Sequence, residues 1–274
     1  MRNAPRFGVN TYSYIYSHKA LDCIKRLSDR GYSSFELMMF PGHFWPDELS
    51  LSDRREVRSY LDKNKCHVST INQPNIDINI AAATVNMRRY SVDIIIKMLE
   101  LAADIGCKSI IIGPGKANPL FPAPASQLKS WFFSSLDELI TVSEKQQVRL
   151  LVENMPFSFL PECEGLMKVL DDYGNDEIGV VYDIANSAYI REDLTAGIAA
   201  MAGRLKHIHL SDTQLNVYQH APIGAGVIPF DKFGKYINQM NCSECPILEI
   251  VAPEPDKHID ASAQRLADLG WAWR

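Results

Sequence analysis

The sequence predicts an α/β protein that folds as a single (β/α)₈ barrel. Short β-branched or apolar runs alternate with longer amphipathic segments from the first residues to the last, and the chain holds eight such pairs. Several amphipathic segments end at a glycine, the residue that most readily closes a helix in the left-handed conformation. The length of 274 residues suits one barrel, which typically takes about 250 residues. We therefore expect one domain over residues 1–274.

The predicted strands share a run of β-branched and aliphatic residues, and in chain order they cover 7–11, 34–38, 67–72, 109–112, 148–153, 178–183, 205–210 and 247–250. The predicted helices carry apolar residues at a helical spacing, over 18–30, 51–64, 86–105, 125–146, 162–173, 193–202, 230–240 and 258–269. Gly31, Gly106, Gly174 and Gly270 are expected to mark the ends of four of these helices.

An open doubly wound sheet is the main alternative fold, and two features disfavour it. Such a sheet usually has fewer than eight strands. Its first turn also commonly carries a G-x-G-x-x-G motif, whereas the glycine-rich stretches here, 113–116 and 224–226, match neither a dinucleotide nor a phosphate-loop fingerprint. The closed barrel is therefore favoured.

The composition disfavours several classes of protein. Lys and Arg number 28 against 33 acidic residues, and no basic run occurs, so a nucleic-acid partner is not expected. The N-terminal residues lack the apolar core of a signal peptide, and no window of about 18 residues is free of charge, so we expect a cytoplasmic protein without a membrane segment. Cys242 and Cys245 form an isolated CxxC, which favours reduced thiols over a zinc knuckle.

Four consecutive predicted strands finish in a residue able to bind a metal. These residues are Glu153, Asp183, His209 and Glu249. Each alone could cap a helix or pair with a cation, but neighbouring strands lie about 4.8 Å apart and bring all four to one rim of the barrel, where active sites form. Three carboxylates repel one another unless a cation compensates them, and oxygen ligands with one imidazole suit Mn²⁺, Mg²⁺, Co²⁺ or Zn²⁺. We predict one divalent metal ion here.

The histidines around strand 205–210 need separate assignments. His207 and His209 share one face because side chains alternate along a strand. His209 lies nearer the C-terminal end of the strand and is taken as the metal ligand, while His207 is expected to pack inside the barrel. His220 follows in the next loop, where it either reaches the mouth of the barrel and contacts substrate or is exposed to solvent.

The motifs on the last four strands now carry a family resemblance. The chain reads VEN at 152–154, YDIAN at 182–186, HIHLSD at 207–212 followed by HAPIGAG at 220–226, and LEI at 248–250. This combination resembles the sugar phosphate isomerase/epimerase superfamily of xylose isomerase-like TIM barrels. That superfamily includes ketose 3-epimerases, hydroxypyruvate isomerase, inosose-processing enzymes and endonuclease IV.

The resemblance implies a metal-dependent isomerase or epimerase of a small keto-sugar or related polyol. It implies that Glu153, Asp183, His209 and Glu249 hold one metal ion, with Mn²⁺ favoured, and that Glu153 and Glu249 handle protons on opposite faces of the sugar. A metal ion on a carbonyl and the adjacent hydroxyl acidifies the C–H and stabilises the enediolate. One glutamate then removes the proton and the other returns it.

Departures from the family pattern keep alternative functions open. Ketose epimerases commonly have a histidine and an arginine where this chain has Asn186 and Leu215. Endonuclease IV has further metal ligands where this chain has Gln73, Gly113 and Tyr218, which argues against a nuclease. A dehydratase or lyase of inosose or dehydroshikimate type is the main alternative on the same site, and a sugar-binding barrel without turnover is another.

Polar residues just past other strand ends are candidates for binding the substrate, together with Asn186 and His220. They are Asn10, Tyr12, Gln73, Asn75 and Lys116. Glu36 resembles a frequent glutamate on the second strand of the superfamily and either orients substrate or anchors the second loop. The aromatic loop 39–45 suits a wall or lid of the pocket, or a clamp against a partner subunit. A homodimer or homotetramer is compatible with these loops.

Overall fold

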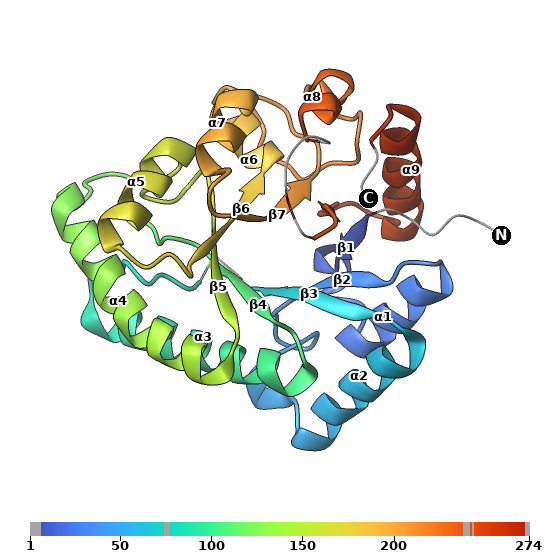
Figure 1. Cartoon of the computed structure of the whole chain (residues 1–274), viewed down its shortest axis with the longest axis horizontal. Helices are drawn as coiled ribbons and strands as arrows, with labels where there is room; N and C mark the ends of the chain where they lie inside the picture. Colours follow the sequence, from blue (N-terminus) through green and yellow to red (C-terminus); the bar gives the residue numbers. More distant parts are fainter. Residues whose placement is uncertain (1–6, 74–76, 238–241, 243, 272–274) are drawn as a thin grey trace.

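A computed structural model describes residues 7–73, 77–237, 242 and 244–271 of the chain. Eight parallel strands pair in chain order and close into a barrel, which the helices surround (Figure 1). The strands are β1 (Gly8–Asn10), β2 (Ser34–Met38), β3 (His67–Asn72), β4 (Ser109–Ile112), β5 (Arg149–Glu153), β6 (Gly179–Asp183), β7 (Leu205–Leu210) and β8 (Ile247–Leu248). The predicted fold class is confirmed. Four predicted strands coincide with β2, β3, β4 and β7, and the others are shorter at one or both ends.

The helices follow the predicted segments closely. They are α1 (Ala20–Asp29), α2 (Leu51–Asn64), α3 (Val85–Ile105), α4 (Ala125–Gln146), α5 (Cys163–Tyr173), α6 (Ile184–Tyr189), α7 (Leu194–Met201), α8 (Phe230–Ile237) and α9 (Pro255–Asp268), with short 3₁₀ turns at Tyr12–Tyr14 and Pro46–Glu48. The last residues of the predicted helix 230–240 lie outside the described residues. All four glycines expected at helix ends have φ between 81° and 96°.

The short helix α6 was not predicted from the sequence. It begins directly after β6, and the carboxylate of Asp183 accepts a hydrogen bond from the backbone N–H of Asn186 at 2.6 Å. An aspartate that caps a helix in this way satisfies a backbone donor that has no partner within the helix. One oxygen of Asp183 therefore holds α6, and the other remains available to the site described below.

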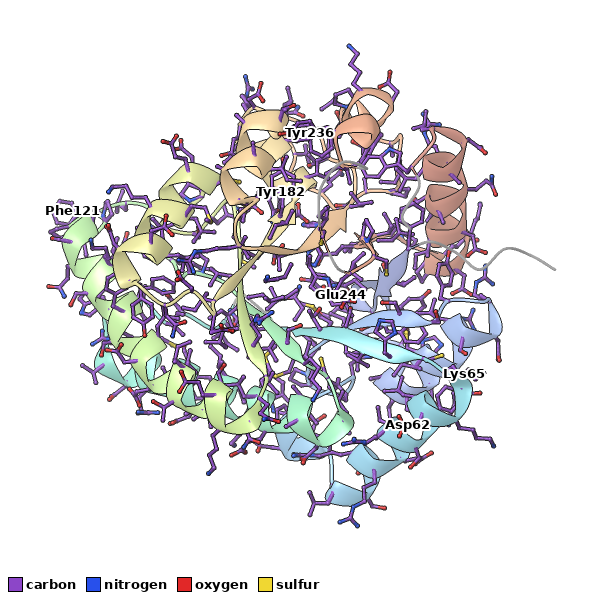
Figure 2. All side chains as sticks on the ribbon, in the orientation of Figure 1. Asp62, Lys65, Phe121, Tyr182, Tyr236 and Glu244 are labelled. Atoms are coloured by element: carbon purple, nitrogen blue, oxygen red, sulfur yellow. The ribbon has the colours of Figure 1, made fainter. Side chains whose placement is uncertain are left out.

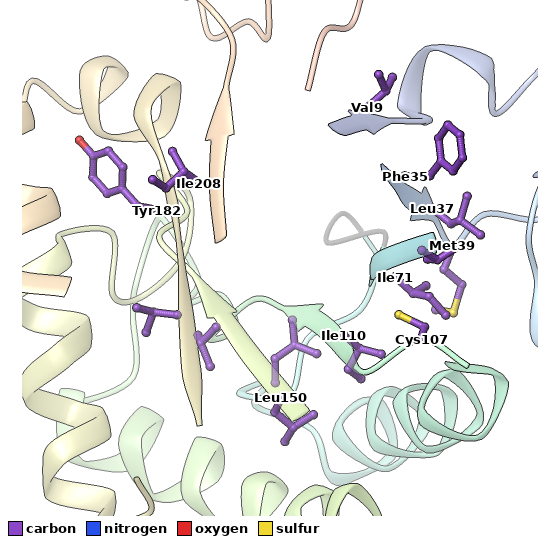
Figure 3. Close-up of a cluster of buried hydrophobic side chains, with 14 of the residues drawn as sticks. Val9, Phe35, Leu37, Met39, Ile71, Cys107, Ile110, Leu150, Tyr182 and Ile208 are labelled. Carbon is purple, nitrogen blue, oxygen red and sulfur yellow. The ribbon is translucent and has the colours of Figure 1, made fainter. Parts of the chain in front are cut away.

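Side chains on the two faces of the strands pack in different surroundings. Phe35, Ile110, Leu150 and Tyr182 join apolar side chains of the helices in one large core cluster (Figure 3). Inside the barrel, Ile111, Leu151 and Val181 form a small separate cluster. The burial of both faces explains why these strands are continuous apolar runs in the sequence. No helix in the described ranges is long and apolar enough to cross a membrane.

Candidate active site

The four predicted metal ligands meet at the C-terminal end of the barrel. Asp183 and His209 are paired in register on β6 and β7, while Glu153 ends β5 and Glu249 follows β8. One ligand atom from each of the four residues lies within 4.8 Å of those of the other three, and all four side chains are buried. The Nδ1 atom of His209 lies 3.2 Å from Glu153 Oε1, 3.1 Å from Glu249 Oε2 and 3.8 Å from Asp183 Oδ2.

The donor set fits a divalent cation. Asp183 Oδ2 is buried and has no hydrogen-bond partner among the described residues, which is a costly state for a carboxylate oxygen. A cation held between Glu153, Asp183, His209 and Glu249 would give this oxygen a partner and would compensate three crowded negative charges. Carboxylates with a single imidazole suit hard or borderline divalent ions rather than thiophilic ones.

The ionisation of the cluster is strongly perturbed by its burial and its neighbours. Burial raises the pKa of Glu153 to about 7 and that of Asp183 to about 6. Burial acts in the same sense on Glu249, but the charges of His220 and His209 outweigh it and lower the pKa of Glu249. The pKa of His209 lies well above its usual value because the charges of Glu36, Glu249 and Glu153 outweigh the cost of burial. The site therefore strongly favours positive charge at its centre.

Glu36 lies beside His209 and is completely buried. Its Oε2 accepts a hydrogen bond from His209 Nε2 at 3.0 Å and another from the hydroxyl of Thr70 at 2.5 Å. Its Oε1 accepts from the side-chain amides of Asn10 at 2.6 Å and Asn72 at 3.1 Å. A proton fixed on Nε2 would leave the lone pair of Nδ1 free for an ion held between the carboxylates, as a metal ligand requires.

The structure thus gives Glu36 protein partners instead of an open position for substrate contact, and we infer that it orients His209. Asn10 is likewise fully buried, and its amide donates to Glu249 Oε1 at 3.3 Å as well as to Glu36. The contacts of Thr70 and Asn72 with Glu36 were not predicted from the sequence. The signal was available, because a threonine and an asparagine two residues apart share one face of β3.

Replacing the carboxylate of Glu36 is expected to weaken metal binding. We expect Glu36→Gln to lower the affinity for Mn²⁺ by about 10- to 100-fold, because the amide is uncharged and has one acceptor oxygen in place of two, so it holds the proton on His209 Nε2 less firmly. Competition with a fluorescent chelator measures this affinity. Glu192→Gln is the matched control, since Glu192 accepts hydrogen bonds from Ser187 and from the backbone of Cys163 but contacts none of the four ligands. Equal losses in both variants would contradict the orienting role.

A cavity of about 940 Å³ opens above the four ligands, and several predicted residues line it. Glu153 and Glu249 reach it from the cluster, and the predicted substrate contacts among its lining residues are Tyr12, Gln73, Lys116, Asn186 and His220. Asn75 lies outside the described residues. The aromatic loop 39–45 is not among the lining residues, because Phe44 packs into the core and His43 contacts the hydroxyl of Thr11.

Tyr218 links the two glutamates through a chain of hydrogen bonds. The amide of Asn186 donates to Glu153 Oε1 at 3.3 Å and to a backbone carbonyl at 2.8 Å, so its oxygen accepts from the Tyr218 hydroxyl at 2.7 Å. The Tyr218 oxygen is then left to accept from His220 Nε2, also at 2.7 Å. On the other side of its ring, His220 Nδ1 lies 3.2 Å from Glu249 Oε2. From the sequence, Tyr218 stands out only because endonuclease IV has a metal ligand at this position, and no pattern in the loop indicates these hydrogen bonds.

Asp212 organises the loop that carries His220. Its carboxylate accepts the backbone N–H groups of Gly224 at 2.8 Å and Ile228 at 3.1 Å, and its backbone pairs with Ala221. The loop is thereby held against the strand end. His220 consequently faces the cluster and is largely buried, which decides between the two positions left open by the sequence.

Comparison with known protein families agrees with the observed fold. Residues 24–269 match the family described as xylose isomerase-like TIM barrel. The chain belongs to this family. The resemblance found in the motifs of the last four strands is therefore confirmed, and the match extends over most of this xylose isomerase-like barrel.

Individual relatives of this xylose isomerase-like barrel are distant. An uncharacterised protein of Methanocaldococcus jannaschii is 21% identical over 232 residues, 82% of this chain and 76% of the relative. The L-ribulose-5-phosphate 3-epimerase UlaE of Escherichia coli is 21% identical over 153 residues, so that the match spans 56% of this chain and about half of that enzyme. The crystal structure of a D-tagatose 3-epimerase-like protein superposes with a TM-score of 0.81 at 19% identity, over 97% of this chain and 99% of the other.

His207, the other histidine of β7, lies toward the opposite end of this xylose isomerase-like barrel. His207 is buried and lines a smaller cavity of about 410 Å³ together with Lys206 and Glu244. Burial lowers the pKa of His207 to about 4, so the ring is neutral at physiological pH.

The six cysteines are free thiols, and Cys242 donates to the backbone carbonyl of Lys206.

Proposed function

We propose that the protein is a divalent-metal-dependent isomerase or epimerase of a small keto-sugar or related polyol. The observation that supports this most directly is the position of the two glutamates. Glu153 and Glu249 approach the same His209 nitrogen at 3.2 Å and 3.1 Å, and both line the cavity. Glu153, Asp183, His209 and Glu249 would hold a divalent ion, which would supply Lewis-acid polarisation of a substrate carbonyl and make the neighbouring C–H more acidic.

In this proposal the glutamates transfer the proton. Glu153 comes from β5 and Glu249 from beyond β8, so they reach the cavity from separate strands of the barrel. One glutamate, as the carboxylate, removes the proton from carbon, and the other, already protonated, donates its own proton from a different side, which inverts the carbon or moves the carbonyl. Proton exchange with solvent then restores the two glutamates to their starting states. Asn186 holds the carboxylate of Glu153 by a hydrogen bond, and His220 pairs with that of Glu249. These contacts fix the two carboxylates in place while the proton moves.

Two further considerations support the reaction class and the metal. The ketose epimerase names of the E. coli relative and of the structural neighbour agree with proton transfer beside a carbonyl. Three carboxylates and one imidazole favour Mn²⁺, with Mg²⁺, Co²⁺ and Zn²⁺ as alternatives. A homodimer or homotetramer stays a prediction for this chain.

Exchange of a carbon-bound proton with solvent tests the proposed reaction. The protein is incubated in D₂O with a panel of ketoses and keto-polyols, once loaded with Mn²⁺ and once stripped with a chelator. We expect deuterium beside the carbonyl of at least one substrate, only in the loaded sample. Loss of water from an inosose or dehydroshikimate would instead select the lyase alternative. No exchange over the whole panel with the ion bound would contradict the proposal.

A further inference from the structure

The cavity above the ligands is divided into a polar floor and an apolar wall. The floor lies at the ends of the strands and carries Glu153, Glu249, Asn186 of α6 and His220 of the loop after β7. The wall is formed by the loops after β5, β7 and β8, and its larger apolar members are Met155, Pro156, Phe157, Pro222, Val251 and Pro253. The volume of about 940 Å³ lies near the upper end of the roughly 300–1,000 Å³ typical of pockets for drug-sized ligands. A keto-sugar alone fills only the part near the floor.

The aromatic part of the wall begins directly at the floor. The ring of Phe157 meets that of Tyr218 edge to face, with centroids 5.3 Å apart, and Tyr189 packs against both rings. The hydroxyl of Tyr218 is fixed by Asn186 and His220, so the same residue belongs to the floor by its oxygen and to the wall by its ring. A ligand seated on the floor therefore lies next to an aromatic surface.

The outer part of the wall is exposed at the mouth of the cavity. Phe157 is 57% exposed and Val251 is 42% exposed, although both are large apolar side chains and both line the cavity. Apolar side chains exposed beside a binding cavity are typical of ligand contact. Lys116 is the single Lys or Arg among the described residues that line the cavity, and it does not belong to the wall.

We propose that this wall is a second subsite of the cavity and that the substrate is a keto-sugar or polyol joined to an uncharged apolar group, such as the aglycone of a glycoside. The sugar end of this ligand rests on the proposed function. The apolar group packs on Phe157, Tyr218 and Val251, where it removes apolar surface from water. Edge and face contacts with the two rings favour an aromatic group over a methyl group.

Two glucosides that differ only in their aglycone test the subsite. The probes are 4-nitrophenyl β-D-glucopyranoside and methyl β-D-glucopyranoside, titrated calorimetrically into the Mn²⁺-loaded protein. We expect the nitrophenyl glucoside to bind at least about tenfold more tightly, since it alone covers the wall. Phe157→Ala is expected to remove this preference. Phe121→Ala is the matched control, because Phe121 is 86% exposed at the periphery of the molecule and does not line the cavity (Figure 2).

The other outcomes overturn the subsite. Equal affinity for the two glucosides, no binding of either, or an equal loss in Phe121→Ala would each contradict it. Tighter binding of glucose 6-phosphate than of the nitrophenyl glucoside would instead indicate a phosphate handle. A Phe157→Ala protein with altered oligomeric state but unchanged nitrophenyl affinity would assign the wall to a second copy of the chain.

The exchange experiment on free ketoses separates this inference from the proposed function. Deuterium exchange without any preference for the aromatic aglycone would overturn only the subsite. A clear aglycone preference, lost in Phe157→Ala but without exchange on any keto-sugar or keto-glycoside, would overturn only the proposed reaction.

Discussion

His209→Ala is expected to leave the purified protein without the proposed divalent ion and to lower the rate of the proposed isomerisation or epimerisation by at least about a thousandfold. Lewis-acid stabilisation by a metal ion is worth several kcal/mol, and each 1.36 kcal/mol changes the rate tenfold. With an ion bound, the imidazole of His209 would be the one neutral ligand beside three carboxylates, all of which approach its Nδ1 within 3.8 Å. Elemental analysis of the purified proteins gives the number of ions per chain, and we expect one in the natural sequence.

His207→Ala is the control for this variant. His207 lies two residues earlier on β7, is buried, and is separated from the cluster toward the opposite end of the barrel. Its loss is expected to lower stability, which thermal unfolding measures, but to leave one ion per chain. A full complement of metal in His209→Ala would show that the ligand set is wrong. Two or three ions in the natural protein would revive the nuclease alternative.

Glu153→Gln and Glu249→Gln are expected to lower epimerisation by about 10²- to 10⁴-fold, the usual contribution of a positioned acid or base. They should differ in the proton exchange that remains. Each variant keeps one glutamate, and that glutamate still exchanges the proton of the epimer whose C–H faces it. We therefore expect deuterium from D₂O in one epimer with Glu153→Gln and in the other epimer with Glu249→Gln.

Nuclear magnetic resonance of the two epimers, incubated separately with each variant, measures this exchange. Glu177→Gln is the control, because Glu177 is exposed and pairs with Arg149 at the opposite end of β5. The metal content of each variant is determined in parallel, so that loss of the ion is not mistaken for loss of a base. Exchange of both epimers by both variants would show that another group moves the proton.

The sequence was sufficient for most of the fold and for locating the group of four residues that could hold a metal. Periodicity located the strands and helices because each barrel strand is buried on both faces while each helix is buried on one. Glu153, Asp183 and His209 were found because each stands at or near the end of a strand, and parallel pairing places strand ends at one rim. Glu249 follows the same rule, although it is the first residue after β8 and not the last residue within that strand.

The roles of the residues around the metal ligands could not be inferred from the sequence. Glu36 looked like a possible substrate contact, yet its carboxylate meets His209, which is 173 residues away in the chain. Tyr218 and Phe157 lie in different loops, and their contact depends on how each loop folds over the rim. Loop residues carry no periodic pattern that would reveal such contacts.

The sequence by itself determined the (β/α)₈ barrel and the group of four residues able to bind a metal, because both follow from local repetition and from the alignment of strand ends. Only the tertiary structure decided that Glu36 contacts His209, that Tyr218 joins Asn186 to His220, and that the cavity has an aromatic wall. The physical reason is that these features depend on hydrogen bonds and ring contacts between loops distant in the chain, whose geometry is fixed only when the barrel closes.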